Sequence, residues 1–153
     1  MPGPASRPAA PAPAGPLREP LAFRLARAAA VATRPLQAQA DKVHQVTLGE
    51  WRLLALLEAH PGLTVTQAAE ALGLDKMAVS RAADGLSRRR RLQRHEDPAD
   101  QRRSRLFLTG AGHALAAAVA AAGQAEEERL RAGLDAQALA HFEAVLDRLI
   151  AAG

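Results

Sequence analysis

The sequence predicts a mostly α-helical fold with one small β-hairpin. Apolar residues make up 48% of the 153-residue chain and most of them are Ala or Leu, whereas aromatic residues contribute only 3%. Ala and Leu favour helices, while sheets draw mainly on β-branched and aromatic residues. Apolar residues also recur at helical spacing along much of the chain, and one pair of short extended runs brackets a polar turn. The length suits one domain of ordinary size.

Residues 1–20 are interpreted as a disordered tail and residues 21–153 as the folded domain. Seven of the ten prolines lie in the tail, and Ala fills much of the remainder, so this segment cannot build a core. A secretory signal is not expected, because arginines interrupt the region that would need a long apolar run. The first 40 residues are rich in Ala and Arg with Glu19 as their only acid, so a transit peptide stays an alternative.

Two absences narrow the classes of function. The chain has no cysteine, which excludes disulfides, thiolate metal sites and thiol redox switching and fits a cytoplasmic location. No run approaches the ~18 apolar residues that a membrane-spanning helix needs. We therefore expect neither a cofactor held by thiolates nor a membrane partner.

The first part of the domain is predicted to hold two helices joined by a connection at residues 41–46. The first helix runs from Leu21 to about Ala40, and Pro35 is expected to kink or divide it. The second begins at a capping box, residues 47–50, in which the side chains of Thr47 and Glu50 can each bond the other's backbone N–H. The residues expected to face inward from it are Trp51, Leu53, Leu54 and Leu57.

Two short helices with a tight turn between them follow. After a short extended piece at residues 63–65, Thr66 is expected to cap the first helix, which ends at Gly73. Asp75 is expected to cap the second helix, which runs to about Arg89. Two short helices joined by a Gly-containing turn are typical of a helix-turn-helix.

A β-hairpin is predicted directly after this motif, in the position of a wing. Its strands are residues 92–95 and 105–108, and residues 97–101 between them are turn formers. Thr109 is then expected to cap a long helix of small residues, and Asp135 a final amphipathic helix. The apolar stripe of that last helix consists of Leu139, Phe142, Val145, Leu146, Leu149 and Ile150.

Positive charge is concentrated between Lys76 and Arg105. This window holds ten basic and four acidic residues, so its charge is +6 while the rest of the chain sums to −2. A basic patch on a near-neutral body is the footprint of a surface that binds nucleic acid. The alternative is a charged face that is only solvated.

At the wing the sequence resembles the MarR family of winged-helix regulators. Asp100 and Arg102 match the Asp-x-Arg of the family's wing tip, and Leu108, Thr109 and Gly112 match the Leu-Thr-x-x-Gly that follows its second strand. Trp51 after the capping box and residues 79–81 in the recognition helix also match, and the likeness covers about residues 21–153. The resemblance implies a winged helix-turn-helix at residues 47–109 and dimerisation helices at residues 21–40 and 110–153.

Three residues depart from the family's pattern. Arg90 stands where the family often has Gly, and because a non-glycine residue resists positive φ, we expect the turn to differ or the helix to extend. Gly85 lies inside the recognition helix, where it costs about 1 kcal/mol relative to Ala. Pro35 in the first helix is the third.

The recognition helix is predicted to place its N-terminal half in the major groove of DNA. Arg81 can then pair with a guanine edge, Ser80 lies beside it, Lys76 suits a phosphate, and Met77 contacts a thymine methyl or, alternatively, packs in the core. Residues Val79 and Leu86 are interpreted as core.

The wing and its surroundings supply the remaining predicted DNA contacts. The resemblance implies that Arg102 enters the minor groove and that Asp100 orients its guanidinium, the alternative being a surface salt bridge. Arg94, Arg103 and the run at residues 88–91 are expected to meet phosphates or to solvate the face. Thr64 and Thr66 can donate to phosphate, although capping alone would explain Thr66.

The resemblance also implies an effector site between the dimerisation helices and the DNA-binding lobe. His44 and Trp51 are the candidates there, although Trp51 also suits the core. Because some relatives sense zinc, the five histidines were compared for metal-ligand spacing: His44, His60, His95, His113 and His141. None is paired with another at i, i+4, so ordinary histidines are favoured and no metal site is predicted.

These features predict a regulator of transcription that binds double-stranded DNA in a sequence-specific way. We expect a homodimer on a pseudo-palindromic operator, acting as a repressor that responds to a small molecule. The alternative is a winged-helix module for protein–protein contacts, its basic face meeting an acidic partner. An enzyme is not predicted, because the sequence holds no nucleophile–base pair, phosphate-binding Gly loop or paired carboxylate set.

Overall fold

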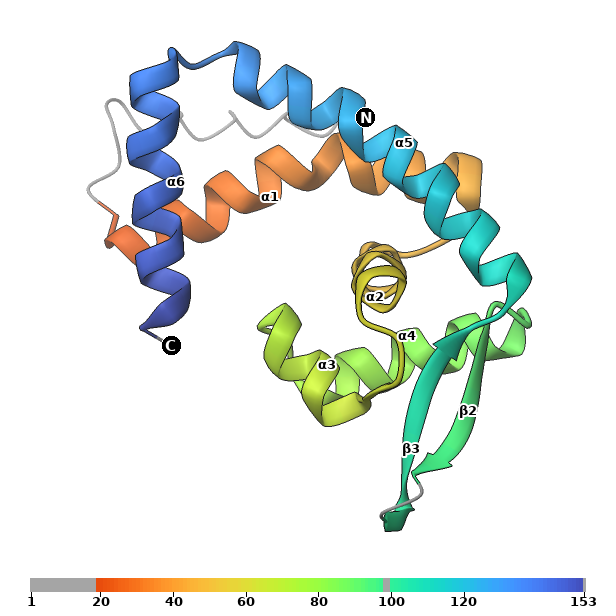
Figure 1. The fold of residues 1–153 in the computed structure, drawn as a ribbon. Coiled ribbons are helices and arrows are strands. Elements are labelled where there is room, and N and C mark those ends of the chain that lie inside the picture. The colour runs from red at the N-terminus through yellow and green to blue at the C-terminus, as the bar shows by residue number, and fades with distance from the viewer. Residues whose placement is uncertain (1–18, 98–99, 153) are drawn as a thin grey trace, which may run out of the picture. The chain divides into compact units, whose positions relative to one another are not determined.

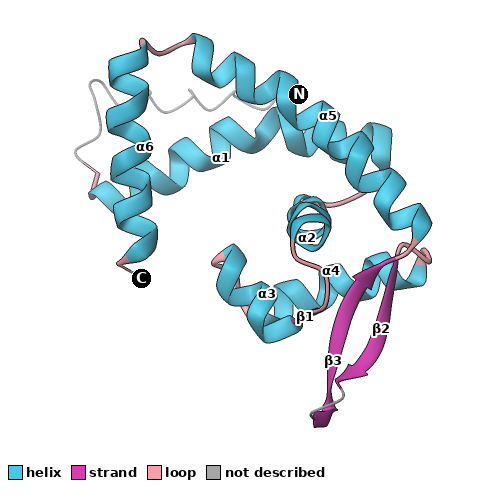
Figure 2. Cartoon of the chain, viewed as in Figure 1, coloured by secondary structure: helices cyan, strands magenta, loops and turns pink. Residues whose placement is uncertain are grey.

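The computed structural model describes residues 19–97 and 100–152, and of residues 100–103 it describes the backbone alone. The described chain is mostly helical with a small antiparallel sheet, as predicted (Figures 1 and 2). The predicted tail, residues 1–20, lies almost wholly outside the described residues. The elements are α1 (Leu21–Gln39), η1 (Ala40–His44), α2 (Leu48–Ala59), β1 (Leu63–Thr64), α3 (Val65–Leu72), α4 (Lys76–Arg88), β2 (Leu92–Asp97), β3 (Asp100–Leu108), α5 (Gly110–Ala132) and α6 (Ala136–Ala151). Residues up to Val31 and residues from Ala32 onward form two separate units.

The region around η1 differs from its prediction. Helix α1 includes Pro35 without being divided, and a π-helical turn follows where a connection was expected at residues 41–46. The turn closes at Gln45, which adopts a left-handed conformation with φ of 53°, and the N–H of Val46 donates to the carbonyl of Ala40 at 3.0 Å. Ala40 and Val46 are both buried, so packing of these small apolar residues keeps the segment helical.

The predicted capping box at the start of α2 is confirmed. The Thr47 hydroxyl accepts from the Glu50 N–H at 3.2 Å, and Glu50 Oε2 accepts from the Thr47 N–H at 2.8 Å. The four residues expected to face inward from α2 are all buried: Trp51, Leu53, Leu54 and Leu57. Helix α2 contacts α3, α4 and α5, and it forms the centre of the core.

The N-cap of α3 is Thr64, so the prediction of Thr66 was wrong. Thr64 makes a capping box with Gln67: its hydroxyl accepts from the Gln67 N–H at 3.3 Å, and Gln67 Oε1 accepts from the Thr64 N–H at 3.0 Å. Three residues after Thr66 stands Ala69, which has no side chain to complete such a box. The helix ends at Gly73 with φ of 61°, and Asp75 caps α4 by accepting from Ala78 at 2.8 Å, both as predicted.

The strands of the wing are longer than predicted. The sheet has the order β1-β3-β2, and β2 and β3 extend together beyond the helix-turn-helix as a two-stranded ribbon (Figure 2). Pairing continues past the apolar residues, with His95 opposite Arg105 and Glu96 opposite Ser104. The prediction relied on apolar residues, whereas the outer part of a ribbon is held by its backbone hydrogen bonds.

In the turn that follows α4, Arg90 takes the left-handed position that glycine usually occupies after a helix. Arg90 has φ of 55°, its N–H donates to the Ser87 carbonyl at 2.9 Å, and the Arg91 N–H donates to the Leu86 carbonyl at 2.9 Å. These two bonds form a Schellman motif. The expectation of a different turn or a longer helix was therefore wrong, because Arg90 accepts the left-handed conformation. The Thr109 hydroxyl donates to the Arg90 carbonyl at 2.8 Å and supports this turn.

The last two helices begin where they were predicted to begin. Thr109 caps α5 by accepting from the Gly112 N–H at 3.1 Å, and Asp135 caps α6 by accepting from the Ala138 N–H at 2.8 Å. Val119 of α5 is buried in the core. Helix α6 has no buried residue, and four of the larger side chains of its apolar stripe are exposed: Phe142, Val145, Leu149 and Ile150.

Candidate nucleic-acid interface

The two faces of α4 have different tasks. Val79 and Leu86 are buried, as predicted, together with Ala82, Ala83 and Gly85. On the other face Lys76, Met77 and Arg81 are exposed and Ser80 is half-buried. Met77 is 65% exposed, so the alternative that it packs in the core is wrong. The first two turns of α4 therefore present a cation, a thioether and a guanidinium outward.

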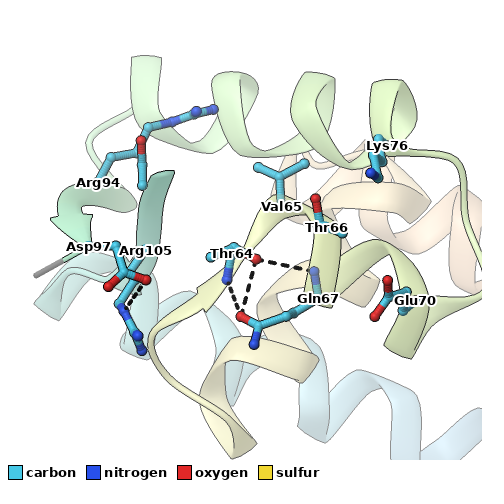
Figure 3. A pocket seen from close by; sticks show the side chains of 10 residues that line it. Thr64, Val65, Thr66, Gln67, Glu70, Lys76, Arg94, Asp97 and Arg105 are labelled. Atoms are coloured by element: carbon cyan, nitrogen blue, oxygen red, sulfur yellow. Dashed lines mark hydrogen bonds and ion pairs between the residues drawn. The ribbon is translucent and has the colours of Figure 1, made fainter. Parts of the chain in front are cut away.

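A hollow of about 680 Å³ lies between α3, the start of α4 and the wing. Figure 3 shows Arg94, Asp97 and Arg105 on the side of the strands and Lys76 and Glu70 on the side of the helices. Thr64 and Thr66 lie in the same lining, so the structure brings both threonines together with Lys76 and Arg94. Since three cations and two carboxylates line the hollow, it carries a modest positive charge.

Two arginines of the wing, Arg94 and Arg105, are each held by an ion pair. Arg94 Nη2 lies 2.6 Å from Asp84 Oδ1, which links β2 to α4 and leaves the side chain of Arg94 34% exposed. Arg105 Nε lies 3.0 Å from Oδ2 of the buried Asp97. Exposed ion pairs add little to stability, but each of these restricts where an arginine points.

The predicted tip residues are only partly described. Asp100, Arg102 and Arg103 have their backbone in β3, and their side chains lie outside what the structure describes, as does the turn at residues 98–99. The roles of Arg102 in the minor groove, of Asp100 as its orienting partner and of Arg103 at phosphate stay predictions.

The arginine run at residues 88–91 does not form a single outward-facing patch. Arg89 contacts the carboxylate of Glu50 and the carbonyl of Gln45, and Arg91 Nη1 lies 3.4 Å from the carbonyl of His44. These two arginines therefore have partners within the fold, which the sequence prediction did not include, and their contact with phosphate stays a prediction. Charge counting missed the buried Glu50, which was recognised only as half of a capping box.

The structure brings the two candidate effector residues together. The rings of His44 and Trp51 lie edge to face with their centroids 6.4 Å apart. Trp51 is 8% exposed, and a Cβ atom at Gly123 of α5 would lie 3.5 Å from its Cζ2. Trp51 is thus a core residue that also contacts the ring of His44.

Two of the remaining histidines, His113 and His95, have ordinary partners. His113 Nδ1 lies 2.7 Å from Glu58 Oε2, and the ring of His95 packs against that of Phe107 with centroids 5.1 Å apart. Within the described residues, no three histidine, aspartate or glutamate side chains gather as a metal ion would need. Among the described helices, none is long and apolar enough to cross a membrane.

Known proteins share this fold, and a family model matches part of the sequence. The sequence model of the MarR family matches residues 44–103, from the end of η1 to the outer part of the wing. The PcaV transcriptional regulator of Streptomyces coelicolor, solved with its natural ligand, is 28% identical with a TM-score of 0.71, over 84% of this chain and 88% of that one. The chain is thus similar to the MarR family in sequence over residues 44–103 and to solved members of that family in fold.

Two further solved structures are similar to this chain. A MarR-family regulator from Silicibacter pomeroyi is 27% identical over 85% of this chain and 87% of its own, with a TM-score of 0.72. Staphylococcus aureus MepR, solved in complex with DNA, is 22% identical over 89% of this chain and all of its own, with a TM-score of 0.78, and it shares the fold. No curated protein sequence matches the chain. The family consists of transcriptional regulators rather than enzymes, in agreement with the sequence analysis.

Proposed function

We propose that this chain is a MarR-family regulator that binds double-stranded DNA in a sequence-specific way, as a homodimeric repressor that responds to a small molecule. The observation that carries the proposal is the outer face of α4: Lys76, Met77 and Arg81 are exposed in its first two turns. Beside them lies a hollow that includes Arg94 and Arg105. A recognition helix needs outward side chains in its N-terminal half and a basic border to meet phosphates.

Each of these side chains suits one part of a DNA duplex. Arg81 is proposed to pair with the O6 and N7 atoms of a guanine, and Met77 to contact a thymine methyl. Lys76, Arg94, Thr64 and Thr66 are proposed to meet phosphates, since they line the hollow between the recognition helix and the wing. Arg102, oriented by Asp100, is proposed to enter the minor groove, with Arg103 at the backbone. The DNA complex of MepR, which shares the fold, is consistent with this role.

The dimer is proposed from α6. Its described side chains are all at least partly exposed, and Phe142, Val145, Leu149 and Ile150 are between 41% and 78% exposed. Burying such a stripe against a second copy is favourable at roughly 25 cal/mol per Å² of apolar surface. A two-fold dimer would read a pseudo-palindromic operator with half-sites about one helical turn, ~10 bp, apart.

The effector is proposed to bind near His44 and Trp51, whose rings are in contact. PcaV was solved with its natural ligand, and the DNA binding of Bordetella bronchiseptica BpsR is regulated by 6-hydroxynicotinic acid. We propose that a small molecule likewise regulates this chain, and that it acts in the cytoplasm, where its DNA would lie.

Selection of duplexes from a random pool, followed by a salt titration, tests the proposal. The chain should enrich a two-fold symmetric sequence and bind it far more tightly than random DNA. Its affinity should fall steeply with salt, because each neutralised phosphate contributes about −0.9 to the slope of log K against log salt. A flat salt response, or equal affinity for enriched and random duplexes, would refute the proposal and favour contacts with an acidic protein.

A further inference from the structure

A partly buried ion pair connects the start of α2 with the end of the recognition helix. Glu50, in the first turn of α2, is only 4% exposed, and its Oε1 contacts Nη2 of Arg89, the residue that caps α4. The other carboxylate oxygen, Oε2, accepts the Thr47 N–H at 2.8 Å. Both oxygens of Glu50 are therefore engaged, and the bond to the Thr47 N–H fixes the carboxylate at the start of α2.

Arg89 makes two further contacts around this carboxylate. Its Nη1 donates to the carbonyl of Gln45, in the segment that leads into α2, and its Nε donates to the carbonyl of Gly85 at 3.1 Å. Arg91 adds a bond to the carbonyl of His44 at 3.4 Å. The last turn of α4 is thereby attached to residues 44–45 as well as to Glu50.

The glycine inside α4 is explained by the same carboxylate. A Cβ atom at Gly85 would lie 2.0 Å from Glu50 Oε1, a distance at which one of the two must move. Glycine in a helix interior is unfavourable relative to alanine. Despite this cost, glycine at position 85 leaves room for the carboxylate of Glu50 against the backbone of α4.

We propose that Glu50 is a positioning residue for DNA recognition, which acts through Arg89 to set the orientation of α4; this rests on the proposed function. A buried ion pair is weak evidence of added stability, because apolar residues of the same volume often stabilise as well. The planar guanidinium of Arg89 fixes the direction of the contact, because its N–H donors lie in a rigid fork. Groups that recognise a ligand must be held to within about 0.5 Å. The pair acts at one end of a 13-residue helix, and Lys76, Met77 and Arg81 read DNA at the other end.

Glu50→Gln is the variant that isolates this role. Glutamine keeps an oxygen to accept the Thr47 N–H, so the helix cap is retained while the charge that holds Arg89 is lost. We expect about tenfold weaker binding to the duplex that the wild-type chain enriches, and unchanged binding to a random duplex of the same length, because the phosphate contacts stay the same. The matched control is Glu127→Gln, which breaks the exposed pair with Arg131 on α5 and should change neither affinity.

Arg89→Lys provides a second variant that keeps the positive charge but loses the fork. It should show the same selective loss, and the double variant Glu50→Gln/Arg89→Lys should be no weaker than either single one, since two residues acting as a unit are not additive. Amide hydrogen exchange without DNA should also be faster at residues 86–91 in Glu50→Gln.

The outcomes separate this inference from the proposed function. Wild-type affinity of both single variants for the enriched duplex would overturn it, and so would equal losses on enriched and random DNA. A wild-type chain that enriches no duplex refutes the proposed function instead. In that case the exchange of residues 86–91 still decides whether Glu50 holds α4.

Discussion

The carbonyl oxygen of Arg91 occupies the space that a side chain at Gly112 would need. A Cβ atom at position 112 would lie 2.0 Å from this oxygen and 3.1 Å from Cβ of Leu108. The start of α5 thus crosses the backbone at the base of the wing at a distance that only glycine allows. This contact gives a physical reason for the glycine of the Leu-Thr-x-x-Gly pattern.

Gly112→Ala should lower the free energy of unfolding by roughly 2 kcal/mol, because the obstructing atom is backbone and cannot rotate away. Urea denaturation at fixed protein concentration measures this. Gly110→Ala is the control, since a Cβ there meets nothing within 4 Å. Equal effects of the two substitutions would show that the close contact is not what requires glycine at position 112.

Arg90→Gly should stabilise the protein by about 0.5–1 kcal/mol. Arg90 has φ of 55°, which an L-residue adopts with strain and glycine adopts freely, although glycine loses more entropy on folding. The melting temperature, compared at one protein concentration, should rise. Arg88→Gly removes the same charge two residues earlier, inside α4, and should lower it. A fall for both variants would contradict strain at Arg90.

Arg102→Ala should weaken binding to the enriched duplex roughly tenfold and leave the proposed dimer intact, because a guanidinium in a narrow minor groove meets concentrated negative potential. Fluorescence anisotropy and size-exclusion chromatography measure the two properties. Arg88→Ala is the control for loss of one charge, as Arg88 is exposed at the far end of α4. The wing assignment fails if the two variants bind alike.

Phe142→Glu should convert the proposed dimer into monomers at micromolar concentration. Phe142 is 48% exposed in the apolar stripe of α6, and burying an unpaired carboxylate in a dimer contact is unfavourable. Sedimentation velocity is the measurement. Ala144→Glu introduces the same charge on the opposite face of α6 and should leave the assembly intact. Persistence of dimers in Phe142→Glu would place the contact elsewhere.

The free energy of unfolding should fall in acid because of Glu126. Hydrogen bonds from Arg129, at 2.9 and 3.0 Å, hold the pKa of Glu126 below its usual 4.5, against burial, which raises it. Because the folded state binds this proton less readily than the unfolded state, the contribution is complete above pH 4.5 and is lost as the pH falls through the lower folded pKa.

Urea midpoints measured for wild type and Glu126→Gln between pH 6 and pH 3 check this prediction. The wild type should be the more stable at pH 6, and the difference should shrink on acidification. Arg129→Gln removes the hydrogen-bond partner of Glu126. The difference in stability between wild type and this variant should shrink on acidification in the same way. A difference that is constant with pH would show that the pair does not set this pKa.

Much of the fold follows from interactions that are local in sequence. The capping box of Thr47 and Glu50, the caps at Asp75, Thr109 and Asp135, and the end of α3 at Gly73 each involve residues within a few positions, so their patterns are visible in the sequence. The exposed face of α4 was predictable for the same reason, because helical periodicity separates Val79 and Leu86 from Met77 and Arg81. Thr66 was wrong as a cap because Thr64, two residues earlier, has the partner Gln67.

Only the tertiary structure decided which residues far apart in the sequence are in contact. Arg89 and Glu50 are 39 positions apart, so the sequence presents one as part of a basic run and the other as a helix cap. Their contact attaches Arg89 to α2 and explains Gly85, and the approach of Arg91 to α5 explains Gly112. By itself the sequence determined the order of the elements and the resemblance to a family, through short-range patterns. Which arginines have partners within the fold depended on where the packed helices bring a buried carboxylate, and no local pattern carries that information.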